Sequence, residues 1–446
     1  EQRDHPEYRG RPVVVGADPE GGEGRGVVST CSYEAREYGI HSAQPISEAY
    51  RRCPDAVFLP VRMDAYRQES RAIREIFSEF TPVIEPLSID EAYLDITGSL
   101  RLFGGKKQLA RQLQHRIEER TGLTASLGVA PNKLVAKIAS DLEKPEGLVI
   151  VEPGEVADFL RPMPVSRLWG VGPKSRRKLE KLGIHTIGDL AARDPEVLEA
   201  RFGAHGREMW RRAQGRDDRP VQPESETKSV GHEHTFESDT ADPELLASTL
   251  MRLSEKVAQR LRADRLRGRT VTTKLRFEDF TTLTRASTLD RHTDSAPEIY
   301  GVASRNLERV NMRRRKVRLI GVTVSGLKES DLRQSSLFGS SAGGESGGSR
   351  QRLLHRAIDL IRARFGHGAI RRGTSLLGDD GVNSVRAQRV HLGVPDASGR
   401  QTPQVVQGSE YDIPADLVIK ALGFDPEDLP TLFNAPELQT TRRGTV

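Results

Sequence analysis

Hydrophobic residues follow two different spacings along the first 151 positions, and the alternation between these spacings predicts an α+β unit. Short apolar runs predict strands in RPVVVGA, PVIEPLSIDEAYLDI, TASLGVA and GLVIV. Between them, apolar residues recur every three to four positions over 64–80 and in KKQLARQLQHRIEER and NKLVAKIASDL, which predicts helices. The glycine-rich GADPEGGEGRGVVS follows an expected strand and lacks the GK[ST] of a P-loop, so it predicts a hairpin loop.

Two further segments have patterns of their own. Residues 152–220 predict short helices arranged around a Gly-x-Gly turn. Residues 228–328 predict the order β-α-β-β-α-β, a ferredoxin-like split unit. In its strand TVTTKLRFEDF, alternation places Val271, Thr273, Leu275 and Phe277 on one face and Lys274 and Arg276 on the other. Such a sheet buries one face and offers cations on the other.

Length and charge add an expectation about partners. A chain of 446 residues predicts three to five compact units. Lys and Arg number 68 against 63 Asp and Glu, and residues 228–328 alone hold 20 against 13, which favours a polyanionic partner. Two cysteines outside any CxxC argue against a disulfide framework and fit a reducing cytoplasm. No apolar run reaches the roughly 18 residues of a membrane span, so no membrane association is expected.

The stretch SIDEAYLDI poses a problem, because Asp90 and Glu91 stand side by side between apolar residues of an expected strand. An unpaired carboxylate is costly to bury, so a partner must compensate both. Divalent cations are one solution, since two such ions clamp the attacking and leaving oxygens in phosphoryl transfer. The alternative is a strand end with two solvated acids, which spacing alone favours.

Four motifs in collinear order favour the metal site over two solvated acids, because together they resemble a known family. YEAREYGI (33–40), SIDEAYLDI (88–96), GVAPNKLVAKIASDLEKPEG (128–147) and LWGVGPKSRRKLEKLGIHTIGDL together resemble the Y-family translesion DNA polymerases, in particular the bacterial DNA polymerase IV type. The resemblance runs from Glu1 to about Leu376. It implies an α+β right-hand polymerase with palm, fingers, helical thumb and ferredoxin-like little finger. The implied reaction is template-directed, low-fidelity addition of deoxynucleotides to a primer 3′ end.

The resemblance also implies domain limits. They are 1–9 and 63–151 for the palm, 10–62 for the fingers, 152–220 for a thumb with a helix-hairpin-helix, 221–227 for a linker, 228–330 for the little finger, 331–339 for a clamp-binding peptide, 340–349 for a flexible linker, 350–376 for a C-terminal helix and 377–446 for an unrelated tail.

Site residues follow from the same resemblance. Asp90 and Glu91 are implied to be catalytic and to hold two Mg²⁺ ions. Those implied to bind the incoming triphosphate are Thr30, Tyr33, Arg36 and Lys144. Those implied to contact primed template DNA are Gly170, Gly172, Lys174, Lys274, Arg276 and Arg314, and those implied to bind the bacterial sliding clamp are Gln334, Leu337 and Phe338 of QSSLF. A plain helix-helix turn at GVGPK and a solvated charge run at RRRK stay open as alternatives.

The sequence departs from the family at its beginning. In the family, a strand with a third metal carboxylate and an aromatic gate against ribonucleotides comes directly before the position of Glu1. We therefore hypothesise a truncated polymerase with impaired catalysis, a monomer of the cytoplasm. The alternative is a non-catalytic factor that binds DNA and the sliding clamp.

The tail from about Asp379 has a different resemblance. VRAQRVHLGVPDASGRQTPQVVQGSEYDIPADLVIKALGFDPEDLP is similar to a C-terminal piece of the flavin- and NADPH-binding small subunit of glutamate synthase. It lacks the GxGxxG fingerprint, so it cannot form a dinucleotide-binding domain alone. We interpret it as a gene fusion or an assembly artefact rather than a second activity; an oxidoreductase would need bound flavin.

Overall fold

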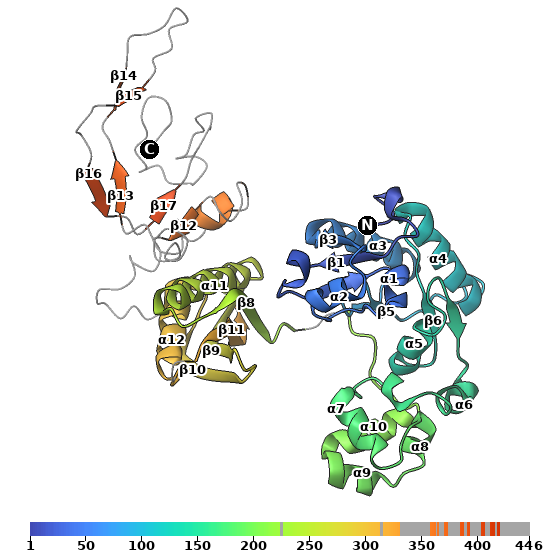
Figure 1. The fold of residues 1–446 in the computed structure, drawn as a ribbon. Coiled ribbons are helices and arrows are strands. Elements are labelled where there is room, and N and C mark those ends of the chain that lie inside the picture. The colour runs from blue at the N-terminus through green and yellow to red at the C-terminus, as the bar shows by residue number, and fades with distance from the viewer. Residues whose placement is uncertain are drawn as a thin grey trace, which may run out of the picture. The chain divides into compact units, whose positions relative to one another are not determined.

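A computed structural model describes residues 1–223, 226–312, 315–330, 357–362 and 364, and six short strands between 370 and 419. The chain divides into two compact units, Glu1–Ser225 and Glu226–Val446 (Figure 1). Arg314, the predicted linker 340–349, most of the tail and the predicted clamp anchors Gln334, Leu337 and Phe338 lie outside the described residues.

The segment predicted to be the fingers contains a three-stranded sheet. Strand β1 (Val13–Gly16) lies at its centre, antiparallel to β2 (Val28–Cys31) and parallel to β3 (Val57–Pro60). Helices α1 (Tyr33–Glu37) and α2 (Ile46–Arg52) pack on it through Ala35, Ile46 and Ala49. Every residue of β1 is buried, as expected for a central strand covered by helices.

The segment predicted to be the palm has two strand pairs and three helices. Helices α3 (Met63–Phe80) and α4 (Lys106–Thr121) share an apolar core, and α5 (Lys133–Ser140) joins parallel strands β6 (Leu127–Val129) and β7 (Leu148–Ile150). Strands β4 (Ile84–Pro86) and β5 (Ala92–Leu94) form a hairpin. The predicted helices and strands are therefore present, but the two strand pairs are separate sheets.

The strand expected over SIDEAYLDI is shorter than the pattern predicts. Only Ala92–Leu94 is a strand, and residues 87–91 form the turn of the hairpin. The amides of Leu87 and Ser88 both donate to the Glu91 carbonyl oxygen, at 2.9 and 3.2 Å. These bonds close the loop and end the strand before the carboxylates, and the chain bends over residues 88–90.

The predicted thumb is helical, as expected. It contains α6 (Val156–Leu160), a 3₁₀ turn η4 (Val165–Arg167), α7 (Pro173–Glu180), α8 (Ile187–Ala191), α9 (Pro195–Phe202) and α10 (Ala204–Ala213). Leu160, Leu179 and Leu198 are fully buried in one apolar cluster. The same cluster includes Leu134 and Ile138 of α5, so the thumb shares its core with a palm helix.

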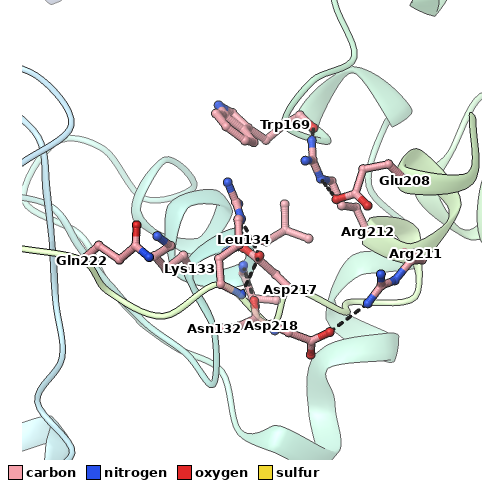
Figure 2. A network of polar contacts seen from close by, with 12 residues as sticks. Asn132, Lys133, Leu134, Trp169, Glu208, Arg211, Arg212, Asp217, Asp218 and Gln222 are labelled. Atoms are coloured by element: carbon pink, nitrogen blue, oxygen red, sulfur yellow. Dashed lines mark hydrogen bonds and ion pairs between the residues drawn. The ribbon is translucent and has the colours of Figure 1, made fainter. Parts of the chain in front are cut away.

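The chain leaves the thumb along residues 215–222, here called the strap, and this segment lies over the start of α5 (Figure 2). Asn132 Nδ2 donates to the Gly215 carbonyl at 2.8 Å, and the Leu134 amide donates to Asp217 Oδ2 at 3.1 Å. The Gln222 amide donates to Glu85 Oε2 at 2.8 Å. The strap therefore connects thumb, α5 and the β4–β5 hairpin.

The predicted little finger has the expected element order. It contains β8 (Ser229–Thr240), α11 (Pro243–Ala263), β9 (Leu266–Phe277), β10 (Thr282–Thr293), α12 (Ala296–Glu308) and β11 (Val317–Glu329), with sheet order β10-β9-β11-β8. Each helix joins two parallel strands separated by one antiparallel strand, which is the split arrangement. One difference from the ferredoxin-like order is that β11, not β10, lies between β8 and β9.

The alternation predicted for β9 is confirmed. Val271, Thr273, Leu275 and Phe277 are buried under α11 and α12, and Lys274 and Arg276 lie on the half-exposed face. Figure 1 shows the two helices side by side.

Beyond the little finger, residues 357–362 are helical and bind α11. Arg262 donates twice to Asp359, at 2.6 and 2.8 Å, and Arg362 pairs with Glu255 at 2.9 Å. Residues Ile370–Arg372 form strand β12 with β17 (Leu417–Ile419), which differs from the helix expected to reach 376. Gly366 and Gly368 just before this strand disfavour a continuous helix. The other tail strands pair as β13 (Ser384–Ala387) with β16 (Tyr411–Pro414) and β14 (Val390–Leu392) with β15 (Pro403–Val405).

Asp217 is the residue of the strap whose loss we expect to cost most stability. Its side chain is 4% exposed and accepts from the Leu134 amide and from Arg219 at 2.6 and 2.8 Å. We predict that Asp217→Asn lowers the free energy of unfolding of the first unit by about 2 kcal/mol, because the buried carboxylate loses its charge-assisted bonds with Arg219 and the Leu134 amide. Urea unfolding followed by fluorescence of Trp169 and Trp210 measures this.

Asp218→Asn is the matched control, because Asp218 is 82% exposed and pairs only with Arg211 at the surface. Its effect should stay within about 0.5 kcal/mol. Burial opposes the charge of Asp217, but the bonds from Arg219 and the Leu134 amide outweigh burial and hold the pKa below 3.8. The difference in the free energy of unfolding between the wild type and Asp217→Asn should therefore be present above about pH 4 and should shrink as the pH falls through the depressed pKa of Asp217. A pH-independent difference would contradict the ionic role.

Candidate active site and DNA-facing surfaces

The two adjacent carboxylates lie in the β4–β5 turn. Asp90 is exposed, and its Oδ1 accepts from Ser88 Oγ at 2.6 Å. Glu91 is 38% exposed, and its Oε1 accepts from Lys137 Nζ at 2.7 Å. Lys137 belongs to α5, so the palm helix compensates one carboxylate while water and a serine compensate the other.

Glu91 begins a row of alternating charges along α5. Lys137 also lies 3.4 Å from Asp141, which in turn pairs with Lys144 at 2.6 Å. We call Glu91, Lys137, Asp141 and Lys144 the charge row. Lys137 and Asp141 are four positions apart at the end of α5, which places them on one helix face, and Lys144 follows in the loop after the helix.

The charge row shifts the pKa of two of its members. Burial disfavours the Lys137 ammonium, but the hydrogen bond to Glu91 and the charge of Asp141 outweigh burial and raise its pKa. Burial also disfavours the Asp141 carboxylate, but the bond from Lys144 and the charge of Lys137 outweigh it and lower its pKa. Both shifts stabilise the charged forms of Lys137 and Asp141.

The donor set suits a hard divalent cation. Asp90 and Glu91 offer carboxylate oxygens on a turn open to solvent, which Mg²⁺ prefers, with remaining ligands from water and phosphates. The ammonium bound to Glu91 shows that a cation is already attracted to this position. Within the described residues, no group of three His, Cys, Asp or Glu side chains converges as a metal cage, so the pair would depend on such outside ligands.

The four residues predicted to bind a triphosphate fall into two groups. Ser32 caps α1 by accepting from the Ala35 amide, and this cap presents Tyr33 and Arg36 on the first turns. The Arg36 guanidinium carbon lies 5.1 Å above the Tyr33 ring, which is 48% exposed, and Thr30 is exposed on the edge strand β2. Lys144 instead belongs to the charge row.

The GVGPK loop of the predicted thumb has the conformation of a tight turn. Gly170 adopts φ +97°, and Gly172 is the N-cap of α7, with Pro173 in its first turn. Lys174 is exposed beside the amides that begin α7. Backbone amides and cations of this kind bind phosphate without reading sequence.

An exposed tryptophan that no sequence motif singled out lies next to this loop. Trp169 is 53% exposed, and the guanidinium carbons of Arg212 and Arg219 lie 5.1 and 4.8 Å from its ring centroids. Arg212 also donates to the Trp169 carbonyl at 3.0 Å (Figure 2). Both arginines are more than 40 positions from Trp169, so no local sequence pattern could have linked them to it. Lys137 and Asp141, by contrast, are four positions apart, a helical spacing that is visible in the sequence.

The open face of the little-finger sheet is less basic than its sequence indicates. Lys274 pairs with Glu233 at 2.8 Å, and Arg276 donates to Thr282 Oγ1 at 3.0 Å. Beside them the register aligns small and hydroxyl residues, namely Gly231, Thr270, Thr272, Gly321, Thr323 and Ser325. The result is a flat surface of hydroxyl groups with paired charges.

A carboxylate pair in a palm hairpin, in a chain that also contains fingers, a helical thumb and a separate four-stranded domain, defines a nucleic-acid polymerase of the right-hand class. Residues 1–141 match the impB/mucB/samB family, 227–337 match its C-terminal domain, and 153–184 match the IMS family HHH motif. The DNA polymerase IV of Desulfatibacillum aliphaticivorans is 45% identical over 367 residues, covering 82% of this chain and 91% of that protein. The DNA polymerase IV of Methanoculleus marisnigri (strain ATCC 35101 / DSM 1498 / JR1) is 51% identical over 306 residues, 68% and 84% of the two chains.

Solved structures agree. A Y-family DNA polymerase chimera, Dbh-Dpo4(243-245)-Dbh, superposes with a TM-score of 0.65 at 31% identity, covering 73% of this chain and 94% of the chimera. The insertion ternary complex of Dbh DNA polymerase has the same coverage and identity with a TM-score of 0.52. The chain belongs to the impB/mucB/samB family of Y-family DNA polymerases.

The two glycines of the GVGPK loop allow a matched test of its geometry. A Cβ on Gly170 would lie 2.9 Å from Arg212 Nη1 at a φ that disfavours alanine, whereas a Cβ on Gly172 meets nothing within 4 Å. We predict that Gly170→Ala destabilises the loop by about 1–2 kcal/mol and weakens binding to a DNA duplex. Gly172→Ala should keep wild-type stability. Urea unfolding and fluorescence anisotropy of labelled DNA measure both, and equal effects of the two variants would contradict the assigned loop geometry.

Proposed function

We propose that this polymerase adds deoxynucleotides to a primer 3′ end by phosphoryl transfer at Asp90 and Glu91, copying damaged templates with low fidelity. The observation that carries the proposal is the turn that presents both carboxylates to solvent beside α5. Their oxygens would hold two Mg²⁺ ions, which stabilise charge on the reacting phosphate and leaving group.

The chain's own residues have separate tasks in this proposal. Arg36, with a planar fork held over Tyr33, suits the phosphate oxygens of an incoming nucleotide, and Lys144 supplies a second positive charge. Thr30 offers a hydroxyl on the neighbouring strand edge. The GVGPK loop with Lys174 and the open sheet face with Lys274 and Arg276 contact the phosphate backbone of primed DNA.

The proposal also includes a protein partner, the sliding clamp. The tail peptide QSSLF, with Gln334, Leu337 and Phe338, is proposed to bind the sliding clamp, and Arg314 to bind DNA. We propose a monomer that works in the cytoplasm. In the described part of the chain, no helix combines the length and apolar character that crossing a membrane requires.

The two separate strand pairs support the hypothesis that catalysis is impaired without the family's acidic first strand. Strands β4–β5 and β6–β7 form two separate pairs, and all residues of β5, β6 and β7 are only half-buried. A further strand between the pairs would cover these apolar residues and bring a third carboxylate. Full activity is therefore proposed to need that strand.

Primer extension tests the proposal. We expect Glu91→Gln and Asp90→Asn each to lower the extension rate at least ~100-fold, because each removes a metal-binding charge. The assay uses primed DNA, deoxynucleotides and Mg²⁺, with the chain as printed and with the family's first strand added before Glu1. Asp64→Asn, at a fully exposed carboxylate on α3, is the control and should extend like its parent.

Two results would decide against the proposal. Extension by Glu91→Gln at the parent rate would remove the carboxylates from the chemistry. DNA binding without extension, in both the printed and the lengthened chain, would favour the non-catalytic binding factor.

Nucleotide binding gives a separate prediction for Arg36. We expect Arg36→Ala to raise the dissociation constant for a deoxynucleoside triphosphate about tenfold, since a charge-assisted hydrogen bond is lost. Filter binding with labelled dATP and Mg²⁺ measures it. Arg51→Ala, which removes an exposed guanidinium from neighbouring α2, should bind dATP like the wild type. Equal losses in both variants would show a general charge effect and contradict a specific site.

A further inference from the structure

The charge row gives both of its inner members two partners at once. Lys137 lies between Glu91 at 2.7 Å and Asp141 at 3.4 Å, and Asp141 lies between Lys137 and Lys144 at 2.6 Å. Two anions therefore compete for Lys137, and two cations compete for Asp141. A change at one end of the row must alter the balance at the other.

One end of the row is the proposed metal carboxylate, and the other is the proposed phosphate-binding lysine. While Lys144 pairs with Asp141, the charge of Asp141 is divided, and Lys137 stays closer to Glu91. If a triphosphate draws Lys144 away, Asp141 has only Lys137 as a partner in the row. Its undivided charge then attracts Lys137 more strongly and weakens the hold on Glu91.

We propose that Lys137 is a positioning residue that competes with the divalent cation for Glu91, and that Asp141 relays nucleotide binding at Lys144 into release of Glu91. The inference rests on the proposed function, because it needs Glu91 at the metal and Lys144 at the triphosphate. It adds an order to that function: the site binds a cation weakly while empty and more strongly once a triphosphate has arrived.

The geometry also explains why a lysine suits this task. The Lys137 side chain is 23% exposed, and the side chains of its partners Glu91 and Asp141 are 38% and 34% exposed. Ion pairs with this much contact with water are individually weak, so an incoming divalent ion or a change in pairing can displace them. A deeply buried pair would instead lock the carboxylate.

The test uses Mn²⁺ alone, without nucleotide, and counts bound ions from the loss of the free-ion electron paramagnetic resonance signal. Glu91→Gln first identifies which binding belongs to this site. We expect Lys137→Met to bind Mn²⁺ about fivefold tighter at that site, because the competing ammonium is gone. Lys137→Arg keeps a cation and should stay near the wild type.

Removing any nearby cation strengthens cation binding to some degree, so a matched control is needed. Arg74→Met serves as this control, because Arg74 donates to the Ser88 carbonyl beside Asp90 but does not belong to the charge row. The gain in Mn²⁺ affinity must be larger in Lys137→Met than in Arg74→Met. Circular dichroism melting confirms that each variant is folded, and Lys137→Gln replaces Lys137→Met if the latter is unfolded.

Lys144→Met imitates the departure of Lys144 and tests the relay itself. It should tighten Mn²⁺ binding in the wild type through Asp141, and this gain should disappear in the Asp141→Asn background, where a direct charge effect would persist. The same gain in both backgrounds overturns the relay. Equal Mn²⁺ affinity of Lys137→Met and Arg74→Met overturns the competition. If Glu91→Gln leaves Mn²⁺ binding unchanged, the metal assignment of the proposed function fails as well.

Discussion

Helix α5 is the element on which the arrangement of the first unit depends. Its buried face belongs to the same apolar cluster as the thumb helices, through Leu134 and Ile138. Its first turn is capped twice, by Asn132 from its own N-cap and by Asp217 from the strap. The free N–H groups of a helix start must find acceptors, and here one acceptor comes from a segment more than 80 positions away. Thumb and palm are thereby fixed to one eight-residue helix.

This constraint also reaches the carboxylates. Lys133, in the first turn of α5, is 8% exposed and binds both oxygens of Glu85 at 3.0 and 2.7 Å, and the strap amide of Gln222 binds the same carboxylate. Glu85 is on β4, so the hairpin that carries Asp90 and Glu91 is attached to α5 at its base by Lys133 and at its turn by Lys137. A displacement of α5 would move the hairpin, the strap and the thumb together.

The sequence predicts the elements well, because their patterns are local. The helix over 64–80 and the face alternation of β9 follow directly from apolar spacing, and the structure confirms both. The end of the strand at SIDEAYLDI was not predictable in this way, since two amide bonds to the Glu91 carbonyl decide it. The Leu134 amide that binds Asp217, and the partners of Glu85 and Trp169, come from distant segments, and no spacing rule records such contacts. The charge row was predictable only in part. The helical spacing of Lys137 and Asp141 is visible in the sequence, but the ion pair between Lys137 and Glu91 depends on tertiary packing.

The number of charged residues in the sequence also differs from the number of free charges in the structure. The excess of cations over 228–328 points to a polyanion, but a formal count treats every cation as available. Lys274 shares its charge with Glu233, Arg315 with Asp279, and Arg262 with Asp359. The open face is rich in hydroxyl-bearing residues and glycines that lie opposite one another on neighbouring strands. Thr323, for example, lies between Thr272 and Gly231. Hydroxyl groups can donate hydrogen bonds to phosphate oxygens without depending on long-range charge. Binding at this face should therefore rely more on close, flat contact with the backbone and less on attraction at a distance than the net charge implies.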